Sequence, residues 1–317
     1  MIELDSVSKN FGSFPAITDI SFRVEQGEIL GFLGPNGAGK TTTMKIITGY
    51  IPPSSGRAEV AGYDVVTQSI DARKQIGYMP ETVPLYTDLS VTEYLSFMGQ
   101  IRGMSRDYIR RRTNDVIDIC RLGDYRRSYI SKLSKGFRQR VGIAQSILHE
   151  PAVLVLDEPT IGIDPIQVVE TRELIRSLGG EHTVIVSTHI LPEVSMICER
   201  VVIIHEGQIV AVDRPENLAA RLRAVERIEI DVQGPTKQIV SALERVDGVQ
   251  SVDRASTPDD AGYSTFHIEA DPASSDVRPR LAAKVVDGGW NLLRLESMGM
   301  SLEEIFLRLT TTEELDV

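Results

Sequence analysis

The chain has 317 residues, which is more than one hydrophobic core usually organises, so we expect a large domain followed by a smaller one. Hydrophobic residues make up 42% of the sequence, but no segment approaches the roughly eighteen uninterrupted apolar residues of a membrane span. The N-terminus lacks the basic and apolar regions of a signal peptide, and a net charge of −11 argues against non-specific nucleic-acid binding. We therefore expect a cytoplasmic chain whose membrane association comes through a partner.

The first 33 residues alternate strand-like runs with turns. The runs cover residues 2–4, 17–24 and 29–33, and the turns lie at residues 11–13 and 26–27. Glycine and polar residues punctuate the turns, as in short antiparallel strands. This part of the sequence predicts an antiparallel subdomain that leads into a nucleotide-binding core.

A loop rich in glycine follows the buried run at residues 28–33. Loop glycines let consecutive backbone N–H groups converge on phosphates, and the helix predicted from residue 42 adds its positive N-terminal dipole. Lys40 is expected to reach the β- and γ-phosphates, and the hydroxyl of Thr41 to complete a Mg²⁺ shell. The phosphate-binding residues predicted here are Gly34, Pro35, Asn36, Gly37, Ala38, Gly39, Lys40, Thr41 and Thr42.

A helical region is predicted from about residue 88 to residue 150, because apolar residues recur there at helix spacing. Near its end, residues 133–140 open a further helix. Ser134 is predicted to cap this helix, and Gly136 to bring the backbone close to a neighbouring segment.

Two adjacent carboxylates, Asp157 and Glu158, end the apolar run at residues 153–156. In a parallel sheet the carboxyl end of a strand is where ligands bind. Neighbouring side chains in an extended segment point different ways, so we expect Asp157 to act on Mg²⁺ through its water shell and Glu158 to act as general base. A solvated helix cap before Pro159 is the alternative, which the apolar run in front of the pair disfavours.

His189 follows another apolar run, at residues 184–188, and is expected to emerge at the same edge of the sheet. There it could donate to the γ-phosphate and orient the attacking water. The remaining histidines and both cysteines are interpreted as structural or surface residues: His149, His182, His205, His267, Cys120 and Cys198.

Residues 221–317 differ from the preceding part in their pattern of strand-like and helix-like runs, and they carry 11 Lys and Arg against 18 Asp and Glu. Their strand-like and helix-like runs follow the order β-α-β-β-α-β, which predicts a small ferredoxin-like α+β domain. Strands that alternate with helices before residue 220 predict instead a mainly parallel sheet covered on both faces.

The segment at residues 133–138 resembles the LSGGQ signature of ATP-binding cassette (ABC) ATPases, and it stands between the phosphate loop and the Asp-Glu pair as in that family. The resemblance covers nearly all of residues 1–220. It implies the α/β fold of a P-loop ABC cassette, with an antiparallel β subdomain and a helical subdomain at about 88–150. The chain looks like ATPase subunits of exporters for drugs, polysaccharides or gliding-motility machinery, and residues 301–309 resemble the closing helix found after their accessory domains.

The same resemblance implies further roles. Phe11 falls where these ATPases stack an aromatic ring on adenine. Asp164, after Ile163, resembles the D-loop aspartate that contacts the opposite subunit. The chain would form a head-to-tail homodimer, in which each ATP lies between one subunit's phosphate loop and the signature of the other, at Ser134, Lys135 and Gly136.

Two motifs depart from the family pattern. Glu81 stands where most cassettes carry Gln, and its carboxylate could approach Mg²⁺ or its water while adding negative charge beside the phosphates. In the signature, Lys135 replaces the first glycine, and Phe137 and Arg138 replace the usual Gln and its successor.

The resemblance implies an ATP- and Mg²⁺-dependent ATPase subunit that drives a separate integral-membrane permease at the inner face of the membrane. The permease is expected to dock near residues 78–100. The alternative of a soluble ABC protein acting on ribosomes or nucleic acid is disfavoured by a single cassette, by a helical insertion of only about sixty residues and by the acidic charge. An ATP sensor without hydrolysis is disfavoured because every expected hydrolytic side chain is present apart from the Gln-to-Glu change. The role of the C-terminal domain is left open.

Overall fold

The computed structural model describes residues 1–215, 217–218, 226–255, 262–271 and 276–298. The chain divides into two compact units, the first built from Met1–Pro215 and the second from Glu216–Arg308. The boundary predicted at residue 220 and the closing helix predicted at residues 301–309 both lie outside the described residues. In the described part of the chain, no helix has the length and apolar character needed to cross a bilayer.

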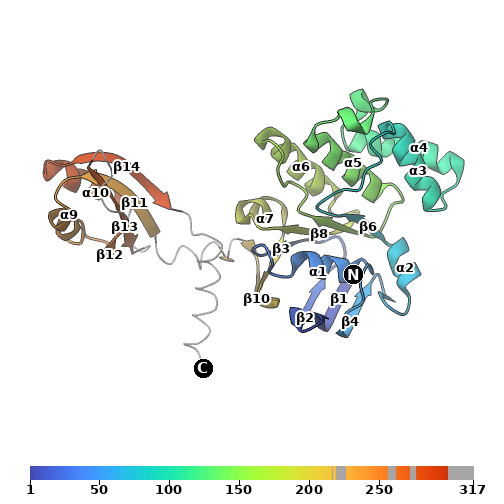
Figure 1. Cartoon of the computed structure of the whole chain (residues 1–317), viewed down its shortest axis with the longest axis horizontal. Helices are drawn as coiled ribbons and strands as arrows, with labels where there is room; N and C mark the ends of the chain where they lie inside the picture. The colour runs from blue at the N-terminus through green and yellow to red at the C-terminus, as the bar shows by residue number, and fades with distance from the viewer. Residues whose placement is uncertain (216, 219–225, 256–261, 272–275, 299–317) are drawn as a thin grey trace. The chain divides into compact units, whose positions relative to one another are not determined.

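An antiparallel sheet forms one end of the first unit (Figure 1). Its strand order is β2-β1-β4-β5. Phe11 and Phe14 face each other where β1 turns into β2. The first strand extends beyond the predicted run at residues 2–4. The prediction missed its second half because register shifts there remove most of the alternation of buried and exposed residues. The strands are β1 (Ile2–Phe11), β2 (Phe14–Val24), β4 (Ser55–Val60) and β5 (Tyr63–Asp64).

A six-stranded sheet crosses the middle of the unit in the order β10-β9-β3-β8-β7-β6. All neighbouring pairs are parallel except β9 and β10. Every residue of β3, β7 and β8 is buried, which explains why these strands read as continuous apolar runs. The strands are β3 (Ile29–Leu33), β6 (Ile76–Met79), β7 (Val153–Asp157), β8 (Thr183–Thr188), β9 (Arg200–His205) and β10 (Gln208–Asp213).

The helices α3, α4 and α5 gather at the end opposite the antiparallel sheet (Figure 1). Ser90 begins α3 with a reciprocal capping box to Glu93, and Ser105, Ser134 and Asp164 cap α4, α5 and α6. The helices are α1 (Lys40–Ile47), α2 (Ser69–Lys74), α3 (Val91–Ile101), α4 (Arg106–Ile119), α5 (Lys135–Ile147), α6 (Pro165–Leu178) and α7 (Leu191–Ile197).

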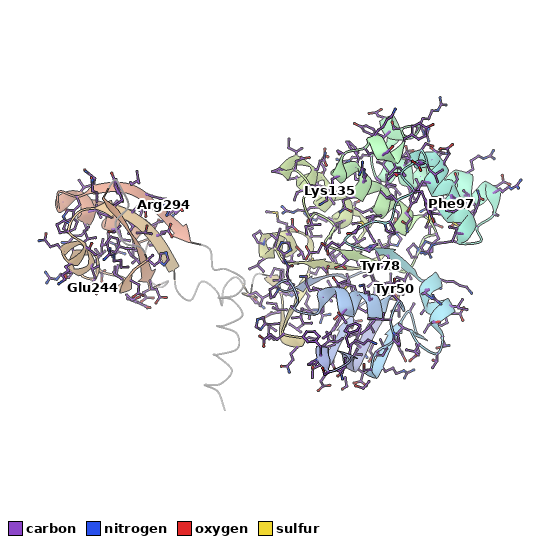
Figure 2. The ribbon with its side chains drawn as sticks, in the orientation of Figure 1. Tyr50, Tyr78, Phe97, Lys135, Glu244 and Arg294 are labelled. Carbon is purple, nitrogen blue, oxygen red and sulfur yellow. The ribbon has the colours of Figure 1, made fainter. Side chains whose placement is uncertain are left out.

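The second unit has the element order β-α-β-β-α-β that the sequence predicts, with the strand order β12-β13-β11-β14 and antiparallel pairing throughout. One face of the sheet buries apolar residues such as Ile230 and Phe266 in a core that also includes Leu281 of α10. On strand β14, Arg294 pairs with Asp231 of β11 at 2.9 Å (Figure 2). The elements are β11 (Glu226–Gln233), α9 (Thr236–Leu243), β12 (Val249–Arg254), β13 (Tyr263–Ala270), α10 (Arg278–Asp287) and β14 (Asn291–Met298).

Candidate nucleotide-binding and hydrolytic site

The phosphate loop connects β3 to α1. Gly39 adopts φ 106° at the start of the helix, a backbone conformation that L side chains rarely adopt. No described side chain caps this helix end, which leaves its first backbone N–H groups available to an external acceptor. The helix begins at Lys40, two residues earlier than the sequence predicts, because the loop turns directly into it.

Lys40 is buried within its own loop. Its ammonium donates hydrogen bonds to the carbonyl oxygens of Gly34 at 2.7 Å and Pro35 at 3.2 Å. It also lies 3.3 Å from the carboxylate of Glu158, which follows β7. The structure therefore brings the predicted phosphate-binding lysine and the predicted general base together.

Asp157 is completely buried at the end of β7. Its Oδ1 accepts a hydrogen bond from the hydroxyl of Ser187 on β8, whereas its Oδ2 has no hydrogen-bond partner among the described residues. A buried carboxylate oxygen without a donor is unfavourable unless a cation or water binds there. The arrangement at Asp157 therefore fits a bound cation or its water shell.

The charge of Asp157 also affects the pKa of a tyrosine on the neighbouring strand β6. Burial, followed by the charge of Asp157 and the proximity of Tyr50, raises the pKa of Tyr78 on β6. Tyr50 and Tyr78 lie close together (Figure 2). The raised pKa means that Tyr78 holds its phenolic proton more tightly than an ordinary tyrosine.

Glu158 has a left-handed backbone, with φ 50°. Its N–H donates to the carbonyl and to the hydroxyl of Ser187, both at 3.1 Å. Its carboxylate lies 3.3 Å from the ammonium of Lys40 on one oxygen and 2.9 Å from Nδ1 of His189 on the other. Asp157 and Glu158 therefore have different partners, although they are neighbours in the chain.

A cavity of about 520 Å³ unites the β1–β2 hairpin, the phosphate loop and the segment after β7. The predicted site residues Gly34, Ala38, Asp157 and His189 are not among the residues that line it. The structure adds Phe14, Ala16 and Ile161 to the lining residues predicted from the sequence. The cavity is lined by Phe11, Phe14, Ala16, Pro35, Asn36, Gly37, Gly39, Lys40, Thr41, Thr42, Glu81, Glu158 and Ile161.

Sequence reasoning missed Phe14 and Ser187. Phe14 is 65% exposed and pairs across the hairpin with Phe11. The turn predicted at residues 11–13 was a signal that could have placed Phe14 beside Phe11. Ser187 is buried in β8, where its hydroxyl hydrogen-bonds to both Asp157 and Glu158. The residues around Ser187 in the sequence give no signal of this role.

The predicted signature residues do not line this cavity. Ser134 caps α5 by accepting a hydrogen bond from the N–H of Phe137 at 3.4 Å, and Asp164 caps α6 by accepting one from the N–H of Gln167 at 3.0 Å. Gly136 lies against Gln167 so closely that an added Cβ would meet its Oε1 at 1.4 Å. The close backbone approach predicted at Gly136 is therefore confirmed, with α6 as the neighbour.

The two departures from the family pattern lie along one smaller cavity, of about 220 Å³. Glu81, Lys135 and Arg138 contribute opposite charges to its wall, and Glu81 lines the larger cavity as well. The ammonium of Lys135, which Figure 2 labels, lies so close to the segment after β7 that a Cβ on Gly162 would meet it at 2.3 Å.

Comparison with known proteins agrees with this geometry. Residues 17–161 match the sequence family described as ABC transporter. The linearmycin resistance ATP-binding protein LnrL of Bacillus subtilis is 31% identical over 98% of this chain and 98% of its own length. The Nod factor export ATP-binding protein I of Rhizobium etli is 33% identical over 98% of this chain and 94% of its own length.

Solved structures show the same likeness. The structure of an ATP-binding subunit of an ABC transporter superposes with a TM-score of 0.63 at 30% identity, covering 70% of this chain and 92% of that one. The chain cbiO1 from Clostridium perfringens gives a TM-score of 0.64 at 28% identity, covering 69% of this chain and 90% of that one. The chain therefore belongs to the family of ABC transporter ATP-binding subunits, and it is an ATPase of that family with exporter-type relatives.

Proposed function

We propose that this chain hydrolyses Mg²⁺-ATP in the 520 Å³ cavity and thereby drives a separate integral-membrane permease, as the ATPase subunit of an exporter. The observation that carries the proposal is the position of Glu158, whose carboxylate bridges Lys40 and His189 at the wall of the cavity. Export as the direction is supported by relatives that are named for linearmycin resistance, Nod factor export and bacitracin transport.

Nucleotide binding begins with exchange of partners at Lys40. The ammonium leaves the carbonyl oxygens of Gly34 and Pro35 and donates to the β- and γ-phosphates, while the loop N–H groups bind the same oxygens. Phe11 lines the cavity from the hairpin and supplies an aromatic face for adenine, and Phe14 beside it extends that surface.

The residues present fit a magnesium ion. Thr41 offers its hydroxyl from the first turn of α1, Asp157 offers the buried Oδ2 that lacks a described donor, and Glu81 adds a carboxylate at the cavity wall. When bound, Mg²⁺ neutralises charge on the transferred phosphoryl group.

In the proposed hydrolysis, Glu158 is the general base. Its carboxylate accepts a proton from the attacking water, because it faces the cavity on the side where the γ-phosphate would lie. His189 holds the second carboxylate oxygen through Nδ1, which fixes the orientation of Glu158, and its other ring nitrogen can donate to the γ-phosphate when the imidazole carries both protons.

The second half of each site is proposed to come from a twin subunit. Ser134, Lys135, Gly136 and Asp164 lie at the beginnings of α5 and α6, apart from the cavity of their own chain. In a head-to-tail homodimer these helix N-termini would face the phosphates bound by the other copy, and closure would depend on ATP.

The permease is proposed to dock on residues 78–100, at the inner face of the membrane. Tyr86 and Phe97 are exposed there and pack edge to face with ring centroids 5.3 Å apart, and Phe97 is labelled in Figure 2. Exposed aromatic pairs of this kind suit the apolar anchor of a protein interface. Specificity for the transported substrate would belong to the permease. The alternative of action on ribosomes or nucleic acid receives no support from the named relatives.

The test is Glu158→Gln in the full-length chain. We expect hydrolysis, followed by phosphate release, to fall below one hundredth of the wild-type rate, while ATP binding is retained. The trapped ATP should then produce a dimer, detected by light scattering after size exclusion. Normal turnover by Glu158→Gln would refute the base assignment, and a monomer at saturating ATP and Mg²⁺ would refute the composite site.

A further inference from the structure

We propose that Glu193 is a positioning residue for hydrolysis, which holds the chain segments that carry Glu158 and His189 in register with each other. This inference rests on the proposed function, because it assigns Glu193 an effect on turnover through the predicted base and its histidine.

Glu193 lies on α7 and is almost completely buried. Its Oε2 accepts hydrogen bonds from the hydroxyl of Thr160 at 2.7 Å and from the hydroxyl of Thr188 at 3.1 Å. Its Oε1 accepts a hydrogen bond from the guanidinium of Arg172 on α6 at 3.1 Å. One carboxylate therefore joins α6, α7 and the segments that leave β7 and β8.

The two threonines flank the hydrolytic pair. Thr160 lies two residues after Glu158, and Thr188 immediately precedes His189. The Thr188 hydroxyl also accepts the N–H of Ile190 at 3.1 Å, so its own hydrogen is left for Glu193. Glu193 consequently fixes both sides of the contact between Glu158 and His189.

This restraint is needed because Glu158 is held in a left-handed backbone conformation. A non-glycine residue at φ 50° is unfavourable and persists only where several surrounding contacts hold the conformation. Ser187 defines it from the N–H side at 3.1 Å, and the Glu193 bond to Thr160 defines the turn that follows.

A carboxylate suits the position better than an amide. Three donors converge on Glu193, and an ionised carboxylate has acceptor sites for all of them. A glutamine of the same size would turn its NH₂ group toward either Arg172 or the threonines and would lose the bonds on that side.

The competing explanation is that Glu193 only stabilises the fold as a buried ion pair. Glu28 provides a matched control, because it is equally buried and pairs with Arg200 at 2.8 Å. Its other oxygen accepts the N–H of Glu25 at 2.8 Å. Glu28 precedes β3, at the end of that strand opposite the phosphate loop.

The experiment compares Glu193→Gln and Glu28→Gln in the full-length chain, with steady-state ATP hydrolysis and thermal unfolding measured for both. We expect Glu193→Gln to lower kcat about tenfold with the KM for ATP within about twofold of wild type. Glu28→Gln should lower the unfolding temperature to a similar degree and leave kcat within about twofold. Equal kcat values in the two variants, or a change confined to KM, would overturn the proposal.

Thr188→Val and Thr160→Val keep the test decisive if Glu193→Gln does not fold. Each variant deletes one hydroxyl and keeps the shape of the side chain, and each should lower kcat severalfold at unchanged KM. Combining Thr188→Val with Glu193→Gln should reduce kcat by less than the product of the single effects, since both remove the same bond. Wild-type kcat in both threonine variants would refute the role of Glu193. A wild-type chain without ATPase activity, or an active Glu158→Gln variant, would instead refute the proposed function itself.

Discussion

Two parts of the first unit use polar groups in opposite ways. The phosphate-loop side contains Lys40, Glu158 and His189, and the signature side contains Ser134 and Asp164. On the phosphate-loop side, Lys40 and His189 each contact the carboxylate of Glu158, which lines a cavity, and Asp157 keeps an oxygen without a described donor. On the signature side, Ser134 and Asp164 are already engaged as helix caps. In the proposed site the first side would exchange partners when the nucleotide binds, whereas the helix caps of the second side would stay in place. This difference is what two half-sites of a shared nucleotide would require.

The largest effect is expected from Lys40→Ala, which removes the cation of the phosphate-loop side. ATP affinity should fall about a hundredfold, because the charge opposite the phosphates is lost and Glu158 is left without its ion pair. Equilibrium binding of a fluorescent ATP analogue measures the change. Lys45→Ala is the control, since Lys45 lies in the last turn of the same helix near Tyr50. Equal losses in both variants would contradict the special role of Lys40.

The next largest effect is expected from Gly136→Ala, which adds one methyl group on the signature side and should affect that side alone. In Gly136→Ala the new methyl group would meet the end of the Gln167 side chain, which must move away from the beginning of α5, and we expect turnover to fall about tenfold with ATP affinity unchanged. Adding Gln167→Ala should restore most of the activity. Gly123→Ala serves as the control, because no described atom lies within 4 Å of a Cβ added there. Loss of ATP binding in Gly136→Ala would break the distinction between the two sides.

The smallest effect concerns Glu81, which lines the cavities on both sides. Glu81→Gln removes a negative charge beside the phosphates, so the affinity for ATP without Mg²⁺ should rise about threefold. With Mg²⁺ present the gain should shrink or reverse, because the ion loses a carboxylate near its shell. Binding isotherms with and without Mg²⁺ measure both values, and an identical gain under the two conditions would show that Glu81 does not act on the ion.

The sheet at the centre of the first unit was predictable because its strands are buried on both faces. Residues 153–156 and 184–186 form continuous apolar runs, and the polar residues that follow each run mark the edge where a ligand is expected to bind. The second half of β1 was not predictable, since its register shifts remove the alternation that identifies a half-buried strand.

The residues around the reactive groups were harder to predict than the groups themselves. Lys40, Asp157, Glu158 and His189 lie in short local patterns, whereas Glu193 has its partners at residues 160, 172 and 188. Such a cluster is created by packing of α6 and α7 near β7 and β8, and no spacing along the chain records it. The roles assigned to the site residues stay predictions until the variants are measured.

The hydrogen bonds of Lys40 to Gly34 and Pro35 set a selectivity threshold for the loop. The ammonium is already satisfied by two carbonyl oxygens, so an incoming anion must offer more than those acceptors before displacement becomes favourable. A single inorganic phosphate or sulfate would make few additional contacts, whereas a nucleoside triphosphate bound as proposed would also engage the loop amides and the aromatic hairpin. We therefore expect phosphate and sulfate, the abundant small anions of a cell, to compete poorly with ATP for this lysine.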